Sequence, residues 1–344
     1  MSHRYSHSYL TCGLCIFITD ISFSSLVIVL LQLHELGKMV VHNRQNATQN
    51  DKDIASEPSR LETITRFIVE SRYYSIPVSF KVVGLWFFVL IISAITLVVD
   101  VRPTYFSHKR NFFNVYLVKF AWGWTLVVTG LYSIVVSFVH GCELWKKTIT
   151  SSILRLAVGT FVWYLWVNVV FHFIENLTGV CIGKDRTPNL SVGSKLDCIQ
   201  LKQGYIWEAV DISGHCFLLT YSILFMKSEL DLQRNWHKIP IHGAQFRAIG
   251  SKSLTNLKSR YKLTLPLVHI LFLVNILLGA LWEFMLLATC VYFHSFLSKA
   301  AGAAIGIFSW LVTYNEWYRC KFPLSIPGHG PLGDLFVKNT KKTE

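Results

Sequence analysis

Charged side chains are scarce in this chain: Asp, Glu, Lys and Arg together account for 15% of its 344 residues. A soluble globular protein carries about 25%. Hydrophobic residues reach 52%, which is more apolar surface than a soluble protein of this size could bury. The same composition excludes an intrinsically disordered chain. The class that remains is a membrane protein that crosses the bilayer several times.

Three further absences narrow that class. The 8 cysteines are too few for a small secreted domain held together by disulfides. The sequence contains no evident internal repeat and no low-complexity tract. It also lacks the alternation of apolar and polar residues that marks transmembrane β-strands, which excludes a β-barrel. We therefore expect an all-α bundle of membrane-spanning helices.

Six segments are apolar over about 20 residues, the length that a helix needs to cross a bilayer. They are residues 77–100, 113–139, 153–174, 208–226, 264–293 and 297–318. A seventh segment, 10–33, is apolar but contains Asp20, so it is a signal-anchor, an extra span or an interfacial helix. We expect three parts: an N-terminal extension (1–76), a six-helix catalytic core (77–320) and a basic, disordered tail (321–344).

The net charge of +13 has two explanations: inward-facing loops beside anionic lipid, or a polyanionic ligand. With six spans, the loops on the side of both core termini contain 22 Lys and Arg residues, against 8 on the other side. The positive-inside rule then places both ends of the core in the cytosol. We expect membrane lipid and a small-molecule substrate as partners, and no nucleic acid.

The long loop 175–207 falls on the lumenal side in this topology. Cys181 and Cys198 are its only cysteines, and the lumen is an oxidising compartment. We predict a disulfide between them. The alternative is two free thiols.

Ionisable residues cluster where the fourth predicted span opens, at its lumenal end. Ser213 and Gly214 can present backbone N–H groups to an anion at a helix N-terminus. His215 can donate or accept a proton near neutral pH, or it can be a hydrogen-bonded structural residue. Asp211 precedes His215 by four residues, so within a helix the two share a face. Asp211 then orients an imidazole or caps the helix.

His294 closes the fifth predicted span, and the topology places that end in the lumen too. His215 and His294 therefore converge on one membrane face from adjacent helices. Such a pair suits phosphoryl transfer, in which one imidazole attacks phosphorus and the other protonates the leaving oxygen. Paired histidines also bind metals, but the sequence offers no third ligand at zinc spacing. We expect neither a metal nor another cofactor.

Five charged residues near the same face are candidates for supporting roles. Glu175 closes the third predicted span, where it can orient a histidine, bind a cation or lie at the interface without a function. Arg102, Lys109 and Arg110 lie in the first lumenal loop, and Lys119 lies within the second span near its lumenal end. These four can clamp phosphate groups or anchor the protein at the membrane interface.

Six stretches are specific enough, in order and spacing, to indicate a family. They are Lys109–Tyr116, Lys119–Thr125, Ile174–Cys181, Asp211–His215, Val291–His294 and Gly306–Tyr318. Together they resemble the fat storage-inducing transmembrane proteins, closest to the type 2 members. The resemblance covers roughly residues 78–330 and leaves out 1–75. The tripeptide Ser213-Gly214-His215 also resembles the second motif of the lipid phosphate phosphatases.

This resemblance implies a six-span protein of the endoplasmic reticulum, with a lipid-phosphatase-like fold. It implies hydrolysis of fatty acyl-CoA to acyl 4′-phosphopantetheine and 3′,5′-ADP, in support of lipid droplet formation and membrane homeostasis. The two catalytic histidines of the family match His215 and His294. By analogy with the phosphatases, His294 is the nucleophile and His215 the general acid. The phosphatase arginine and aspartate that flank the nucleophile are missing near His294, which leaves Asp211 and Glu175 as candidate partners.

Two other functions fit parts of the sequence. A non-enzymatic protein that binds and partitions diacylglycerol or triacylglycerol would explain the apolar bundle, but not the paired histidines. A phosphatase acting on lipid monoesters would need the complete third phosphatase motif, which the chain lacks.

Overall fold

A computed structural model describes residues 59–71, 74, 76–183, 194–200, 205–238, 251–320 and 324–328. The predicted segment 10–33 and most of the predicted tail lie outside these residues. Within the described part the chain is helical almost throughout, which confirms the all-α prediction. Its one sheet is a short antiparallel pair formed by β1 (Val180–Ile182) and β2 (Ile206–Glu208).

Five helices are long and apolar enough to cross a membrane. They cover Val78–Val98, Ala121–His140, Cys142–Thr178, Thr255–Tyr292 and Phe296–Cys320. The elements that make them up are α4 (Val78–Val98), α5 (Ala121–His140), η3 (Cys142–Leu144), α6 (Trp145–Tyr164), η4 (Leu165–Val170), α7 (Phe171–Thr178), α10 (Ser251–Tyr292), α11 (Phe296–Trp310), η7 (Leu311–Trp317) and η8 (Tyr318–Cys320). The membrane prediction is therefore confirmed for five of its six spans by length and composition.

The remaining predicted span corresponds to α9 (Gly214–Leu230), a helix of 17 residues. It is shorter than the other five and lies at the centre of the bundle, packed against α4, α5, α10 and α11. Every residue from Cys216 to Leu230 is buried. A helix enclosed on all sides is apolar all round rather than on one stripe, and α9 accordingly carries no charged residue from Cys216 to Met226.

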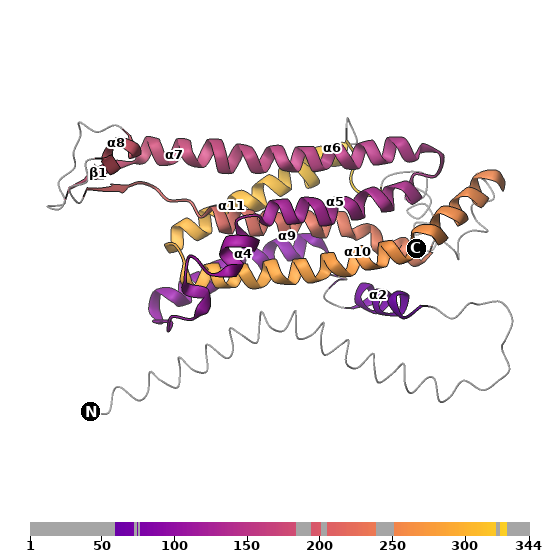
Figure 1. Ribbon diagram of the computed structural model, residues 1–344, viewed down its shortest axis with the longest axis horizontal. Helices are drawn as coiled ribbons and strands as arrows, with labels where there is room; N and C mark the ends of the chain where they lie inside the picture. Colours follow the sequence, from indigo (N-terminus) through magenta and orange to yellow (C-terminus); the bar gives the residue numbers. More distant parts are fainter. Residues whose placement is uncertain are drawn as a thin grey trace, which may run out of the picture.

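The helices run along the long axis of the molecule (Figure 1). One end carries β1, β2, α8 (Lys195–Gln200), η1 (Tyr105–Ser107) and the turn between α10 and α11. The other end carries α2 (Arg60–Glu70) and the turn between α5 and α6. We call the first of these the disulfide end, because the Cys181–Cys198 disulfide lies there.

Two glycines on α11 let that helix approach α9 at backbone distance. A Cβ atom on Gly302 would collide with the carbonyl oxygen of Ser213, and one on Gly306 would lie 2.9 Å from the carbonyl oxygen of Phe217. Small residues at such spacing are typical of close helix pairs in membranes. The contact presses the start of α9 onto the first turns of α11 and so places the site residues described below.

The far end of α9 is held by a buried ion pair. Arg155 of α6 and Glu229 of α9 are 4% and 1% exposed, and the Nε–Oε1 distance is 2.8 Å. Ser133 of α5 and Tyr314 of η7 also donate hydrogen bonds to the Glu229 carboxylate, at 2.9 Å and 2.7 Å. This carboxylate therefore joins four elements of the bundle, and its charge is compensated by hydrogen bonds as well as by the guanidinium.

The segment before α4 closes the same end. α2 packs against α10 and η5 (Asp231–Lys238). The buried Tyr74 hydroxyl donates to the carbonyl oxygen of Leu230, and Lys227 Nζ donates to the carbonyl oxygen of Tyr74 at 2.8 Å. Burial raises the pKa of the Tyr74 hydroxyl well above its ordinary value, which keeps it protonated as a donor.

Helix boundaries differ from the predictions near the disulfide end. The second predicted span starts as a π-helix, η2 (Phe113–Val118), and its α-helical part begins only at Ala121. The fourth was expected to start at residue 208, but the helix starts at Gly214. The reason is that residues 206–208 pair with β1, and Ser213 then caps α9 by accepting a hydrogen bond from the Cys216 amide at 3.3 Å. Asp211 is therefore not helical and does not share a helix face with His215.

Candidate active site

His294 occupies the sharp turn between α10 and α11. Its φ of 59° lies in the left-handed region, which a residue with a side chain rarely adopts. The turn is bounded by the Phe293 amide, which donates to Thr289 O at 3.1 Å, and by Ser295, whose hydroxyl caps α11. Backbone strain of this kind is typical of functional sites. The turn presents the imidazole of His294 at the end of the bundle instead of packing it inside a helix.

Asp211 lies against this histidine from a different part of the chain. Its Oδ2 atom is 2.7 Å from Nδ1 of His294, across 83 residues of sequence. An ionised carboxylate only accepts hydrogen bonds, so the contact assigns the ring proton to Nδ1. The Nε2 atom of a neutral His294 then carries the lone pair.

His215 lies next to this pair, as the second residue of α9. The ring centroids of His215 and His294 are 6.4 Å apart, and the ring planes meet at 71°. Two imidazoles at this separation can act on one reacting group, one as nucleophile and the other as acid or base. The structure therefore brings together the two histidines that hydropathy and charge counts placed on one face.

Ser213 and Gly214 form the start of α9. Ser213 is fully buried, its hydroxyl caps the helix, and its amide donates to Ser298 O at 3.1 Å. Its hydroxyl therefore serves the fold. Gly214 is the first helical residue, and the first amides of a helix have no acceptor within it. The positive end of the helix dipole thus lies beside His215.

One of the four predicted phosphate-binding residues is near the histidines. Lys119 follows η2, is exposed, and interacts electrostatically with His215. Arg102, Lys109 and Arg110 are exposed on the segment between α4 and η2. They lie at the same end of the bundle, and within the described part of the chain none of them forms a hydrogen bond or ion pair with either histidine.

An aromatic contact holds this cationic segment on α10, and amide hydrogen bonds fix the path of the segment itself. The ring of Phe106 packs edge-on against Phe284 of α10, with centroids 5.0 Å apart. The side-chain amide of Asn111 donates to the carbonyl oxygen of Phe106 at 3.3 Å, and its Oδ1 accepts from the Asn114 amide at 2.7 Å. The segment therefore has a defined path along the disulfide end.

Glu175 does not contact His294. It pairs with Lys195 at 2.5 Å and lies 3.6 Å from His172. With Trp207 and Asp211 it lines a hollow of about 210 Å³ between α7 and the link that leads to α9. Of the two carboxylates considered as partners of His294, the structure places Asp211 in hydrogen-bond contact and Glu175 in an ion pair of its own.

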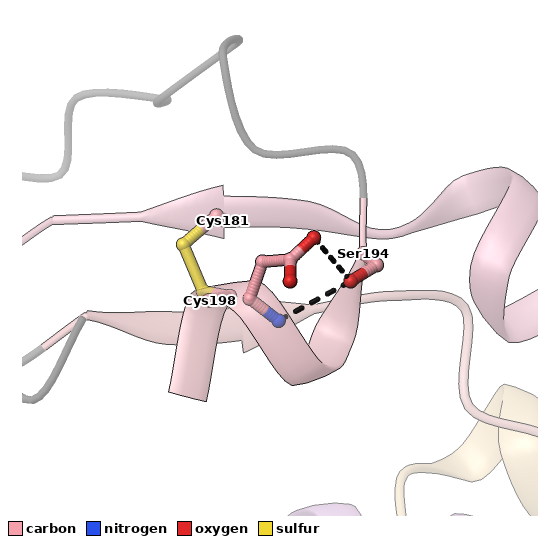
Figure 2. The surroundings of a disulfide bond; sticks show 4 residues. Cys181, Ser194 and Cys198 are labelled. Atoms are coloured by element: carbon pink, nitrogen blue, oxygen red, sulfur yellow. Dashed lines mark hydrogen bonds between the residues drawn. A yellow bond between two sulfur atoms is a disulfide. The ribbon is translucent and has the colours of Figure 1, made fainter. Parts of the chain in front are cut away.

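Cys181 and Cys198 are joined in a disulfide, with Cα atoms 5.7 Å apart (Figure 2). Cys181 lies on β1, where its register partner is Trp207 of β2, and Cys198 lies on α8. Ser194 at the start of α8 accepts a hydrogen bond from the Asp197 amide at 3.2 Å (Figure 2). The disulfide therefore braces the strand pair whose second strand runs into Asp211 and His215.

Two residues of α11 reach this site that the sequence did not single out. The Ser298 hydroxyl donates to the carbonyl oxygen of Asp211 at 2.5 Å. Lys299 is 3% exposed, and its Nζ donates to Cys290 O at 2.7 Å. A lysine near the start of an apolar span is a signal that could have drawn attention to Lys299. Nothing in the local sequence marks Ser298.

Comparison of the sequence with known proteins identifies a family and several relatives. The family model described as Fat storage-inducing transmembrane protein matches residues 102–314. Acyl-coenzyme A diphosphatase FITM2 of Xenopus tropicalis is 34% identical over 225 residues, or 62% of this chain and 73% of that protein. The Drosophila melanogaster FITM2 protein is 30% identical over 256 residues, which cover 70% of this chain and 58% of the fly protein.

Relatives of a second type match as well. Fat storage-inducing transmembrane protein 1 of Homo sapiens is 33% identical over 251 residues, or 71% of this chain and 76% of the human protein. No solved structure matches this chain. The matched range 102–314 contains Asp211, His215, His294 and Ser298, and it excludes α2.

Proposed function

Because this chain belongs to the fat storage-inducing transmembrane protein family, we propose that it hydrolyses fatty acyl-CoA at the pyrophosphate. The products are acyl 4′-phosphopantetheine and 3′,5′-ADP. Relatives named acyl-coenzyme A diphosphatase support this activity. The observation that carries it is the pair of imidazoles 6.4 Å apart, one of them held by a carboxylate.

The proposed reaction has two steps. In the first, His294 Nε2 attacks one phosphorus of the anhydride, a P–N bond forms, and the bridging P–O bond breaks. His215 enters this step as the imidazolium, beside the anionic phosphates of the substrate, and gives its proton to the leaving oxygen. In the second step water attacks the phosphohistidine, His215 takes the proton from that water, and the P–N bond breaks. Throughout, Asp211 accepts from Nδ1 and stabilises the positive charge that His294 acquires.

The surroundings supply the electrostatics for this reaction. Lys119, which interacts electrostatically with His215, and the N-terminus of α9 stabilise the negative charge that develops on the transferred phosphoryl group in this proposal. Arg102, Lys109 and Arg110 on the adjoining segment bind the outer phosphates of the substrate. The acyl chain lies among the apolar helices.

The proposed setting is the membrane of the endoplasmic reticulum, with the site in the lumen and both ends of the six-helix core in the cytosol. The distribution of 22 Lys and Arg residues on one side against 8 on the other supports this orientation. A disulfide at the site end agrees with an oxidising compartment. In this setting the activity supports lipid droplet formation and membrane homeostasis.

A second function, binding and partition of diacylglycerol or triacylglycerol, is in keeping with the fat storage that the family description names. It explains the apolar bundle. It does not explain why Asp211 is placed on His294 beside His215.

The test is to incubate the protein, purified in detergent, with oleoyl-CoA and no added metal, and to detect 3′,5′-ADP by mass spectrometry. Wild type should release it, and His215→Ala and His294→Ala should not. His108→Ala is the matched control, since His108 is an exposed histidine at the same end of the bundle. Thermal unfolding of each variant checks the fold. A folded wild type that binds triacylglycerol without releasing ADP would favour lipid partition.

A further inference from the structure

The carboxylate of Asp211 needs something to hold it in place. Its side chain is 65% exposed, whereas that of His294 is 26% exposed. An exposed carboxylate is hydrated and free to rotate, so its contact with an imidazole is weak unless another group fixes it. The link that carries Asp211 is also outside any helix. Its position must come from contacts with the rest of the bundle.

Ser298 makes those contacts on both sides of Ile212. Its hydroxyl donates to Asp211 O at 2.5 Å and lies 3.4 Å from Asp211 Oδ2, the atom that accepts from His294. Its carbonyl oxygen accepts from the Ser213 amide at 3.1 Å. Ser298 is itself 3% exposed, so water does not compete for these bonds.

The first turn of α11 therefore positions both partners of the hydrogen bond, Asp211 and His294. His294 lies four residues before Ser298, and the Ser298 amide donates to the Ser295 hydroxyl at 3.3 Å. Lys299, next in sequence, ties this turn to the end of α10 through Cys290 O. A lysine there also satisfies a terminal carbonyl group and the negative end of the helix dipole.

We propose that Ser298 is a positioning residue, which holds the Asp211 carboxylate on Nδ1 of His294 and so keeps Nε2 directed at phosphorus. The inference rests on the proposed hydrolysis of acyl-CoA. Ser298 does not touch the reacting atoms in this proposal; it acts through Asp211. Its loss should therefore slow the chemical step and leave substrate binding almost unchanged.

The experiment compares Ser298→Thr with Ser298→Val in the oleoyl-CoA assay. The two side chains have the same shape and strain the site equally, but only threonine keeps the hydroxyl. We expect Ser298→Val to lower kcat by about 10²-fold with KM within about two-fold of wild type, as for a misplaced catalytic group. Ser298→Thr should recover most of that loss. Ser309→Ala is the control, because the bond that the Ser309 hydroxyl makes among the described residues stays within its own helix, to Ile305 O at 2.8 Å.

A double-mutant cycle tests whether Ser298 acts on the reaction through Asp211. In an Asp211→Ala background, Ser298→Val should cost no further activity, since the residue through which it acts is gone. Equal activity of Ser298→Val and Ser298→Thr would overturn the inference, as would an undiminished loss in the Asp211→Ala background. Either result leaves the proposed function intact, because that function fails only if wild type releases no 3′,5′-ADP.

Discussion

The Nδ1 atom of His294 and the Oδ2 atom of Asp211 lie 2.7 Å apart, although 83 residues separate them in the chain. The contact joins the turn after α10 to the link before α9. It determines which nitrogen of His294 carries the proton. The protonated nitrogen is therefore set by Asp211, although the Asp211 carboxylate is exposed.

Replacing Asp211 should therefore affect catalysis far more than stability. We expect Asp211→Asn to lower kcat by about 10²–10⁴-fold, because an amide no longer enforces the Nδ1–H tautomer or stabilises the imidazolium. Rates of 3′,5′-ADP release measure the effect. Glu175→Gln is the matched control, since Glu175 is a carboxylate at the same end that pairs with Lys195 instead. Equal losses in the two variants would contradict the assignment.

Gly302→Ala should damage both the fold and the site. The added methyl group would collide with the carbonyl oxygen of Ser213, so the start of α9 must move away from α11. Overpacking of this kind costs about 1–3 kcal/mol. Gly84→Ala in α4 is the control, because a Cβ there has nothing within 4 Å. Thermal unfolding should show a lower Tm for Gly302→Ala alone, and an unchanged Tm would show that the helices can separate without cost.

Arg155→Met should be among the most destabilising single changes. It leaves the Glu229 carboxylate, 1% exposed, without its cation. Removing one partner of a buried pair costs about 3–5 kcal/mol. The double variant Arg155→Met with Glu229→Gln should recover part of this loss, because no unpaired charge is left. Unfolding free energies in detergent measure the difference, and a double variant no better than Arg155→Met would contradict the account.

Opening the disulfide should loosen the site end. Cys181 and Cys198 are 17 residues apart, and a loop of about that size contributes about 3 kcal/mol when closed. We expect Cys198→Ser to lower Tm and to reduce the rate of ADP release, since β2 leads directly to Asp211. Cys320→Ser is the control, as Cys320 is an exposed free thiol at the opposite end. Alkylation before and after reduction identifies the bonded pair.

Sequence reasoning reached the parts of the site that depend on helix length and order. His215 lies at the start of α9 and His294 follows the end of α10. These two helices run in opposite directions, so the start of the first and the end of the second lie on the same face. Asp211 was named, but its placement in a helix was wrong, since the pairing of β2 with β1 is a non-local contact that the 3.6-residue pattern does not contain.

The remaining contacts depend on how helices approach each other. Arg155 lies near the start of a predicted span and Lys227 directly after another, and nothing in the local sequence shows that both are buried. Ser298 reaches Asp211 only because Gly302 admits the backbone of the link at close range. The left-handed φ of His294 likewise depends on the helices on either side of the turn. Local propensity says nothing about any of these.

The shortness of α9 has a consequence for depth. Its 17 residues extend about 26 Å at 1.5 Å per residue, less than the roughly 30 Å of a hydrocarbon core. Because other helices enclose α9, its length does not have to equal the thickness of the surrounding lipid. A helix shorter than the hydrocarbon core leaves at least one of its polar ends below the level of the headgroups. A recessed end at His215 would let a substrate bring its phosphates to this histidine while its acyl chain stays in the hydrophobic layer.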